Sequence, residues 1–128
     1  MENGKFRIVT NNPIIKENAE FAHEIIFVKG SPIDVLNKSE ELLQQNWKMR
    51  STPLPPNIPI MRAPYRSLVI QESDKQYDSL GILAVSKARE RYIRERQFAV
   101  REESNDFAII DNTMLKRTLR DISLIDTQ

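Results

Sequence analysis

Five segments of the chain carry apolar patterns that predict β-strands. Residues 5–10 alternate between polar and apolar side chains, and residues 48–52 are expected to form a shorter strand. Residues 24–28, 66–72 and 106–111 each contain a run of apolar, often β-branched side chains. The run at 24–28 has almost no polar position, which is typical of a strand buried on both faces of a parallel sheet.

Four further segments, at 13–21, 31–47, 78–96 and 113–122, predict helices. In the second of these, apolar residues recur at helical spacing on one side and polar residues occupy the other. The residues expected to cap the four helices are Asn12, Ser31, either Asp74 or Asp78, and Asn112. Their side chains accept hydrogen bonds from the first free N–H groups of a helix.

The helix near residue 31 carries the most complete start signal. Ser31 is a natural N-cap, and Pro32 fits the first helical position. Asp34 stands where the acid of a capping box is expected. This helix is therefore expected to begin directly after Gly30 and Ser31.

The order of these elements predicts an α/β sandwich with a mostly parallel sheet of four to five strands flanked by helices. The length of 128 residues predicts a single domain over 1–128. A segment at about 52–65 is rich in proline, which can continue neither a helix nor a central strand. We expect it to be extended and to lie over the fold, because long loops in compact domains often have a function.

Composition and charge exclude several classes of protein. Apolar residues make up 40% of the chain and charged residues 29%, which is typical of a soluble globular protein. The net charge of +1 gives no overall attraction to nucleic acid or to a membrane surface. No uninterrupted apolar run is longer than four residues, so we expect no membrane span. The first residues do not have the pattern of a secretory signal, and we expect the protein to be cytoplasmic.

The residue types limit the chemistry further. There is no cysteine, which excludes disulfides, thiolate nucleophiles and iron–sulfur clusters. There is one histidine, His23, so no site can contain two histidine ligands from this chain. His23 could act as a general base, but no nucleophile or carboxylate partner stands near it in the sequence. We therefore assign no catalytic residue, no metal and no cofactor.

The first candidate site lies where the first two predicted strands end. Asn11 and Asn12 follow one strand, and Gly30 and Ser31 follow the next. The carboxyl ends of parallel strands meet at one edge of a sheet, so these residues are expected to lie together. The N–H groups at the start of the Ser31 helix could bind an anion that the asparagine amides orient. The alternative is that Asn12 and Ser31 only cap helices.

The second candidate site surrounds the proline-rich segment. Lys48, Arg50, Arg62 and Arg66 occur in a stretch without acidic residues, together with Tyr65. Such a group could bind a phosphate, a carboxylate or an acidic partner. The alternative is that these are solvated loop charges.

Other charged groups are expected to be structural. The cations at 89–96 fit a solvated helix surface, and too few aromatic residues accompany them to favour nucleic acid. Asp106 and Asp111 flank the last predicted strand and are expected to cap its ends rather than to form a catalytic carboxylate pair.

The order of several short motifs resembles the GrdX family, small proteins encoded with glycine, sarcosine or betaine reductase components in anaerobic bacteria. The matching stretches are Ile8-Val9-Thr10-Asn11-Asn12-Pro13, Val28-Lys29-Gly30-Ser31-Pro32-Ile33-Asp34-Val35-Leu36, Thr52-Pro53-Leu54 and Ala63-Pro64-Tyr65-Arg66-Ser67. They span most of residues 6–71. One departure is Thr52, because many family members are expected to have a histidine before the Pro-Leu pair.

The resemblance implies an accessory role near glycine reductase, with no defined reaction. Glycine reductase chemistry relies on selenocysteine and cysteine, and this chain has no thiol. The leading hypothesis is therefore a non-catalytic protein that binds a reductase component or another protein. The alternative is a binding protein or enzyme for a small anion, with its site at the carboxyl edge of the sheet.

Overall fold

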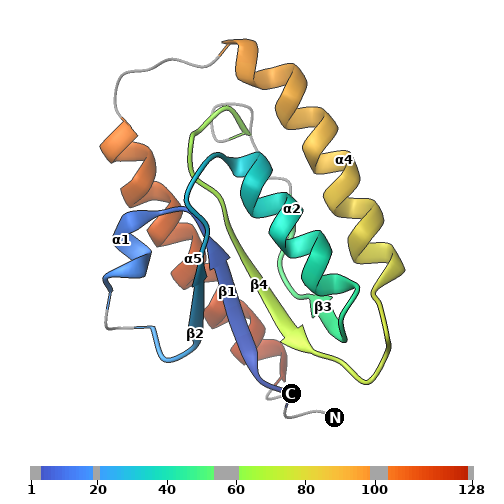
Figure 1. The fold of residues 1–128 in the computed structure, drawn as a ribbon. Coiled ribbons are helices and arrows are strands. Elements are labelled where there is room, and N and C mark those ends of the chain that lie inside the picture. The colour runs from blue at the N-terminus through green and yellow to red at the C-terminus, as the bar shows by residue number, and fades with distance from the viewer. Residues whose placement is uncertain (1–3, 19–20, 54–60, 99–103, 127–128) are drawn as a thin grey trace.

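The computed structural model describes residues 4–18, 21–53, 61–98 and 104–126. One mixed sheet forms the middle layer, with helices on both of its faces (Figure 1). Helices α2 and α4 cover one face, and α1 and α5 cover the other. The strands are β1 (Phe6–Thr10), β2 (Glu24–Phe27), β3 (Trp47–Met49) and β4 (Ser67–Glu72). The helices are α1 (Pro13–Lys16), α2 (Pro32–Leu43), α4 (Ser79–Glu95), the 3₁₀ turn η1 (Arg96–Phe98) and α5 (Ser104–Asp126).

The strand order is β2-β1-β4-β3, and the sheet is mixed rather than mostly parallel. β1 pairs with β2 in parallel, whereas β4 runs antiparallel to both β1 and β3. A parallel neighbour needs a crossover, which is usually a helix. The connection between β3 and β4 contains five prolines. The chain reverses direction over this connection, because β4 pairs antiparallel with β3. The part of this connection at 54–60 lies outside the described residues.

Three helix starts agree with the predicted caps. The Asn12 side chain accepts a hydrogen bond from Ile14 N, and Ser31 forms a complete capping box with Asp34. Asp78 accepts from Gly81 N at the start of α4. The predicted lengths were less accurate, because α1 has only four residues and α2 ends before Trp47, which begins β3.

The predicted strand at 106–111 is wrong, because these residues belong to the 23-residue helix α5. The apolar run there resembles a strand only when it is read locally. Ala108, Leu115 and Ile122 recur every seven residues, are almost fully buried, and define one face of a helix. Ile109 and Ile110 point away from that face and are 50% and 39% exposed.

The strand at 24–28 is also less buried than predicted. β2 is an edge strand of the sheet, so one of its sides has no neighbouring strand. Glu24 is exposed, and the other three residues of β2 are only partly buried. Apolar composition alone therefore did not distinguish an edge strand from a central one.

Alternating residues of β1 and β4 build two apolar cores, one on each face of the sheet. Val9, Leu68 and Ile70 pack against residues of α2 and α4. Ile8 and Val69 pack on the other side against α1 and α5. In the described residues, no helix combines the length and apolar character needed to cross a membrane.

Candidate functional site

A cluster of buried polar side chains lies where β1 ends and β4 begins. Because the two strands are antiparallel, Thr10 of β1 lies opposite Ser67 of β4. Thr10, Asn11, Asn12 and Arg66 each expose 5% or less of their surface. Asp111 of α5 completes the cluster from above one face of the sheet. Buried polar groups need hydrogen-bond partners, so their contacts show what the cluster does.

Asn11 joins three segments through its amide group. Its Nδ2 donates to Gly30 O and to Pro64 O, both at 2.9 Å. Its Oδ1 accepts from Arg66 N at 2.9 Å. Both amide protons and the carbonyl are therefore occupied by main-chain groups, which ties the ends of β1 and β2 to the start of β4.

The Asn12 side chain likewise joins separate segments, here the two helices α1 and α5. Its Nδ2 donates to Ala108 O at 2.8 Å and to Asp111 Oδ2 at 3.0 Å. Its Oδ1 accepts from Ile14 N as the cap of α1. One fully buried side chain thus connects β1, α1 and α5.

Two hydroxyl groups extend this network across the sheet edge. Ser67 Oγ donates to Asp111 Oδ2 at 2.6 Å, and Thr10 Oγ1 lies 2.7 Å from Ser67 Oγ. A serine hydroxyl has one proton, so Thr10 supplies the proton between the two hydroxyls. Thr10 Oγ1 in turn accepts from Asn12 N at 3.0 Å. The polar chain therefore runs from Asn12 through Thr10 and Ser67 to the carboxylate.

Arg66 is 4% exposed and contacts the main chain on both sides of the proline-rich segment. Its Nη1 donates to Pro53 O at 3.0 Å and its Nη2 to Met61 O at 3.3 Å. Its guanidinium carbon lies 5.8 Å from the centroid of the Tyr92 ring of α4. Its Nε is buried and has no hydrogen-bond partner among the described residues.

Burial changes the acidity of the three titratable groups here. It lowers the pKa of Arg66, and the negative charge of Asp111 opposes this effect. It raises the pKa of Asp111 despite the hydrogen bonds from Ser67 and Asn12 and the charge of Arg66. It also raises the pKa of Tyr92. The site therefore holds two opposite charges in an environment that disfavours both.

The amino-acid sequence matches the model of one protein family. The family model described as GrdX-like protein matches residues 7–120. The chain belongs to the GrdX-like family. The match confirms the resemblance and extends it through α4 and most of α5, so it includes the whole polar cluster. Comparison with curated proteins and with solved structures gave no match.

The structure brings only some of the predicted site residues of this GrdX-like protein together. Asn11, Asn12 and Arg66 lie in the polar cluster, and Gly30 contributes its carbonyl oxygen. Ser31 caps α2, as the alternative interpretation expected. Gly30 has a φ of 144°, and a Cβ there would collide with the Asp34 side chain, so the capping box itself requires glycine.

The predicted group of cations around the proline-rich segment does not form one patch. Arg50 lies at the other end of the sheet, where it pairs with Asp126 at 2.9 Å. Arg62 pairs with Glu95 of α4, also at 2.9 Å. Lys48 is in β3, and Tyr65 is partly buried beside Arg66. A ligand role for these residues stays a prediction.

The sequence interpretation missed three residues of the cluster, Ser67, Tyr92 and Asp111. Asp111 was taken as the end of a strand because the apolar run at 107–110 precedes it. The seven-residue spacing of Ala108, Leu115 and Ile122 is the signal that would have placed Asp111 on a helix. Nothing local distinguishes Ser67, since its role depends on a contact 44 residues away.

His23 and the cations of α4 lie outside the cluster. His23 packs against Phe6 at the opposite end of β1, with ring centroids 5.4 Å apart. Arg89 pairs with Glu40 of α2, and Arg91 with Glu95, as expected for a helix surface. Within the described ranges, no group of acidic or histidine side chains could hold a metal ion.

Replacing Asp111 with asparagine removes the titratable carboxyl group. It keeps an oxygen that can accept the hydrogen bonds from Ser67 and Asn12. Because the native pKa is raised, the stability that Asp111 contributes is complete below its unfolded pKa of about 3.9 and is lost as the pH rises through the native pKa. We expect the stability of Asp111→Asn relative to the natural protein to increase as the pH rises above about 4 and through the native pKa of Asp111. Urea unfolding of both proteins measures this difference. A difference that is constant, or that shifts in favour of the natural protein, contradicts the pKa direction.

Proposed function

We propose that this GrdX-like protein is an accessory protein that binds a component of a glycine reductase system and performs no redox step itself. Family membership over residues 7–120 supports the connection with these systems. The sequence has no cysteine, so the chain cannot supply the thiol that such chemistry needs. Both facts are consistent with a role in binding another protein.

The hydrogen bonding of the Asn11 and Asn12 side chains supports a non-catalytic role. Both amides donate two hydrogen bonds and accept one, and all six connect segments of this chain. A polar group that reacts with a substrate needs bonding capacity directed at that substrate. The hydrogen bonds of these two amides therefore stabilise the fold, which favours a non-catalytic role for them.

Direct binding to purified reductase components tests this proposal. The protein is immobilised on an optical biosensor and exposed to each component of a glycine, sarcosine or betaine reductase. The biosensor signal measures binding. We expect saturable binding to one component at micromolar concentrations or below. Absence of binding to every component, with a correctly folded protein, contradicts the proposal.

A second function, the binding of a small anion at Arg66, is favoured by one observation. The Nε–H of Arg66 is buried and has no partner among the described residues, and an unsatisfied buried donor costs about 1–3 kcal/mol. A phosphate or carboxylate oxygen would satisfy this donor and would also stabilise the charge that burial disfavours. The site would lie at the predicted edge of the sheet, beside Tyr92 and the described ends of the proline-rich segment.

Thermal unfolding with a ligand panel tests this second function. The panel contains glycine, sarcosine, betaine, acetyl phosphate, phosphate and nucleotides. A ligand at about 100 times its Kd adds about 2.7 kcal/mol, which raises the Tm by roughly 10 °C in a domain of this size. Arg66→Lys keeps a positive charge but has no Nε–H, so it should abolish the shift. The exposed Arg94→Lys is the control and should retain it. An equal shift in both variants would remove Arg66 from the site.

A further inference from the structure

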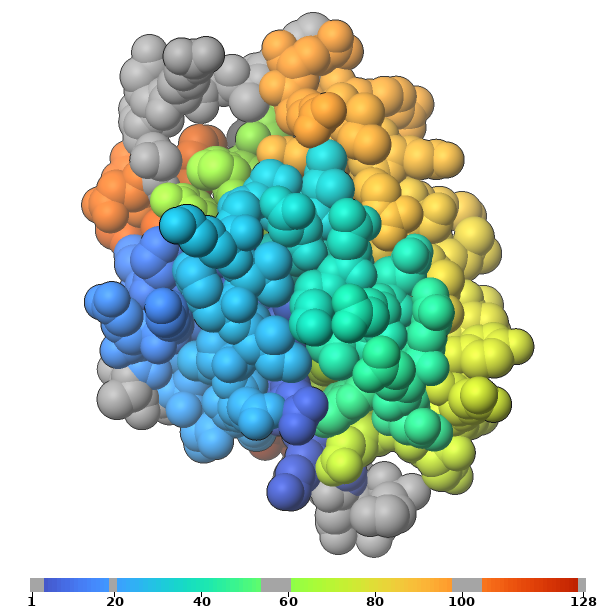
Figure 2. Space-filling view, in the orientation of Figure 1, coloured from blue at the N-terminus to red at the C-terminus, as the bar shows by residue number. Residues whose placement is uncertain are grey.

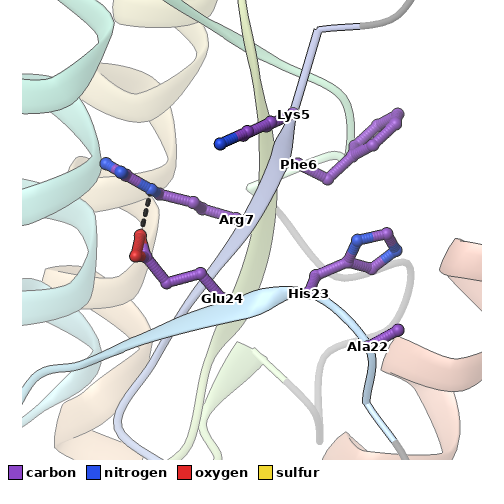
Figure 3. Close-up of a pocket in the computed structure, with 6 residues that line it drawn as sticks. All are labelled: Lys5, Phe6, Arg7, Ala22, His23 and Glu24. Atoms are coloured by element: carbon purple, nitrogen blue, oxygen red, sulfur yellow. Dashed lines mark ion pairs between the residues drawn. The ribbon is translucent and has the colours of Figure 1, made fainter.

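The end of the sheet opposite the polar cluster carries a second, unassigned site. Pairing between β1 and β2 starts at Arg7 and Glu24, so Lys5 and Phe6 have no strand beside them on that side. A cavity of about 330 Å³ fills this notch. Its lining residues are Lys5, Phe6, Arg7, Ala22, His23 and Glu24 (Figure 3). Figure 2 shows the same end of the molecule where β1 emerges below β2.

A second cavity of about 240 Å³ adjoins the notch. Phe6 and His23 line both cavities, so their ring pair stands between them. The second cavity continues along α5 over the apolar side chains of Leu119 and Ile122. Together the two spaces have the dimensions of a small-molecule site with one apolar end.

Some of the polar and charged side chains around these cavities have a hydrogen-bond or ion-pair partner, and others do not. Arg7 forms an ion pair with Glu24, as the dashed line in Figure 3 marks, and Asp126 is paired with Arg50. Neither the Lys5 ammonium nor the imidazole nitrogens of His23 have a hydrogen-bond or ion-pair partner in the described part of the chain. Lys5 is bonded only through its main chain, to Glu72. Among the residues that line the notch, the two positive charges of Lys5 and Arg7 exceed the single negative charge of Glu24, and the Glu72 carboxylate bonded to Lys5 N lies beside them. The His23 imidazole can donate a hydrogen bond.

The arrangement of the side chains separates a polar end from an apolar end. In Figure 3, Phe6 and His23 point to one side of β1, whereas Lys5 and Arg7 point to the other. The Phe6 ring contacts the His23 ring, and the Arg50 guanidinium lies 5.4 Å from its centroid. A ligand that fits has an apolar body for the α5 side and an anionic head for the notch.

We propose that this second site binds a small organic carboxylate with a hydrocarbon tail. The tail packs against Phe6, His23 and Leu119, where it buries apolar surface. The carboxylate lies in the notch on the Lys5 side of β1, where it meets the charge of the Lys5 ammonium. This site lies at the other end of β1 from Arg66 and does not depend on the proposed function.

The single histidine makes the test direct, because the NMR signal of the His23 imidazole needs no assignment. Sodium octanoate is titrated at constant pH, below the concentration at which it forms micelles, and the His23 signal is followed. We expect a saturable shift with octanoate. Acetate, which lacks the tail, and octylammonium, which carries the opposite charge, should give no saturable shift.

Two lysine variants locate the head group. Lys5→Gln keeps the main-chain bonds to Glu72 and should weaken octanoate binding about fivefold, as expected for an exposed ion pair. Lys29→Gln removes an exposed lysine beyond the other end of β2 and should leave the affinity unchanged. A shift that does not saturate, an equal response to octylammonium, or equal weakening by both variants overturns the proposal.

Discussion

The two hydrogen bonds that Asn12 donates to α5 determine how this protein is assembled. They fix the first half of a 23-residue helix to the end of β1, across 96 and 99 positions of sequence. The same side chain caps α1, so one residue sets the position of two helices on one face of the sheet. The apolar core below contributes area, but apolar contacts have no direction and would permit α5 to slide along the sheet. The amide bonds remove that freedom.

This constraint also explains why charge is buried at the edge. Asp111 is held where Asn12 and Ser67 can bond to it, which places it out of water and raises its pKa. Arg66 is buried nearby, and each charge reduces the penalty of the other. Buried charges of this kind often add little net stability but define one arrangement of the chain. At the opposite end of β1 a second polar network joins Asp126, Arg50 and the buried Gln71 to Gly4 O.

Local signals predicted the starts of helices, and distant contacts decided the rest. Ser31, Pro32 and Asp34 specify the start of α2 because the capping box needs only neighbouring residues. The strand at 106–111 was wrong because an apolar run is ambiguous until its packing partner is known. The sheet was expected to be mostly parallel because nothing local indicates that β4 returns antiparallel to β1.

The candidate site was predicted to a similar extent. Asn11, Asn12, Gly30 and Arg66 do meet at one edge, but they bond mainly to the main chain of this protein. Asp111 could not be placed there while its segment was taken as a strand. Arg50 and Arg62 are close in sequence to Arg66, yet their acidic partners lie on helices that follow much later in the chain.

A double-mutant cycle between Asn12 and Asp111 tests the central claim most directly. The stabilities of the natural protein, Asn12→Ala, Asp111→Ala and the double variant are measured by urea unfolding. If Asn12 holds α5 through Asp111, the two substitutions are coupled by about 1–3 kcal/mol, and the double variant loses less than the sum of the single losses. Losses that add to within about 0.5 kcal/mol would mean that the two residues act independently and that Asn12 does not hold α5 through Asp111.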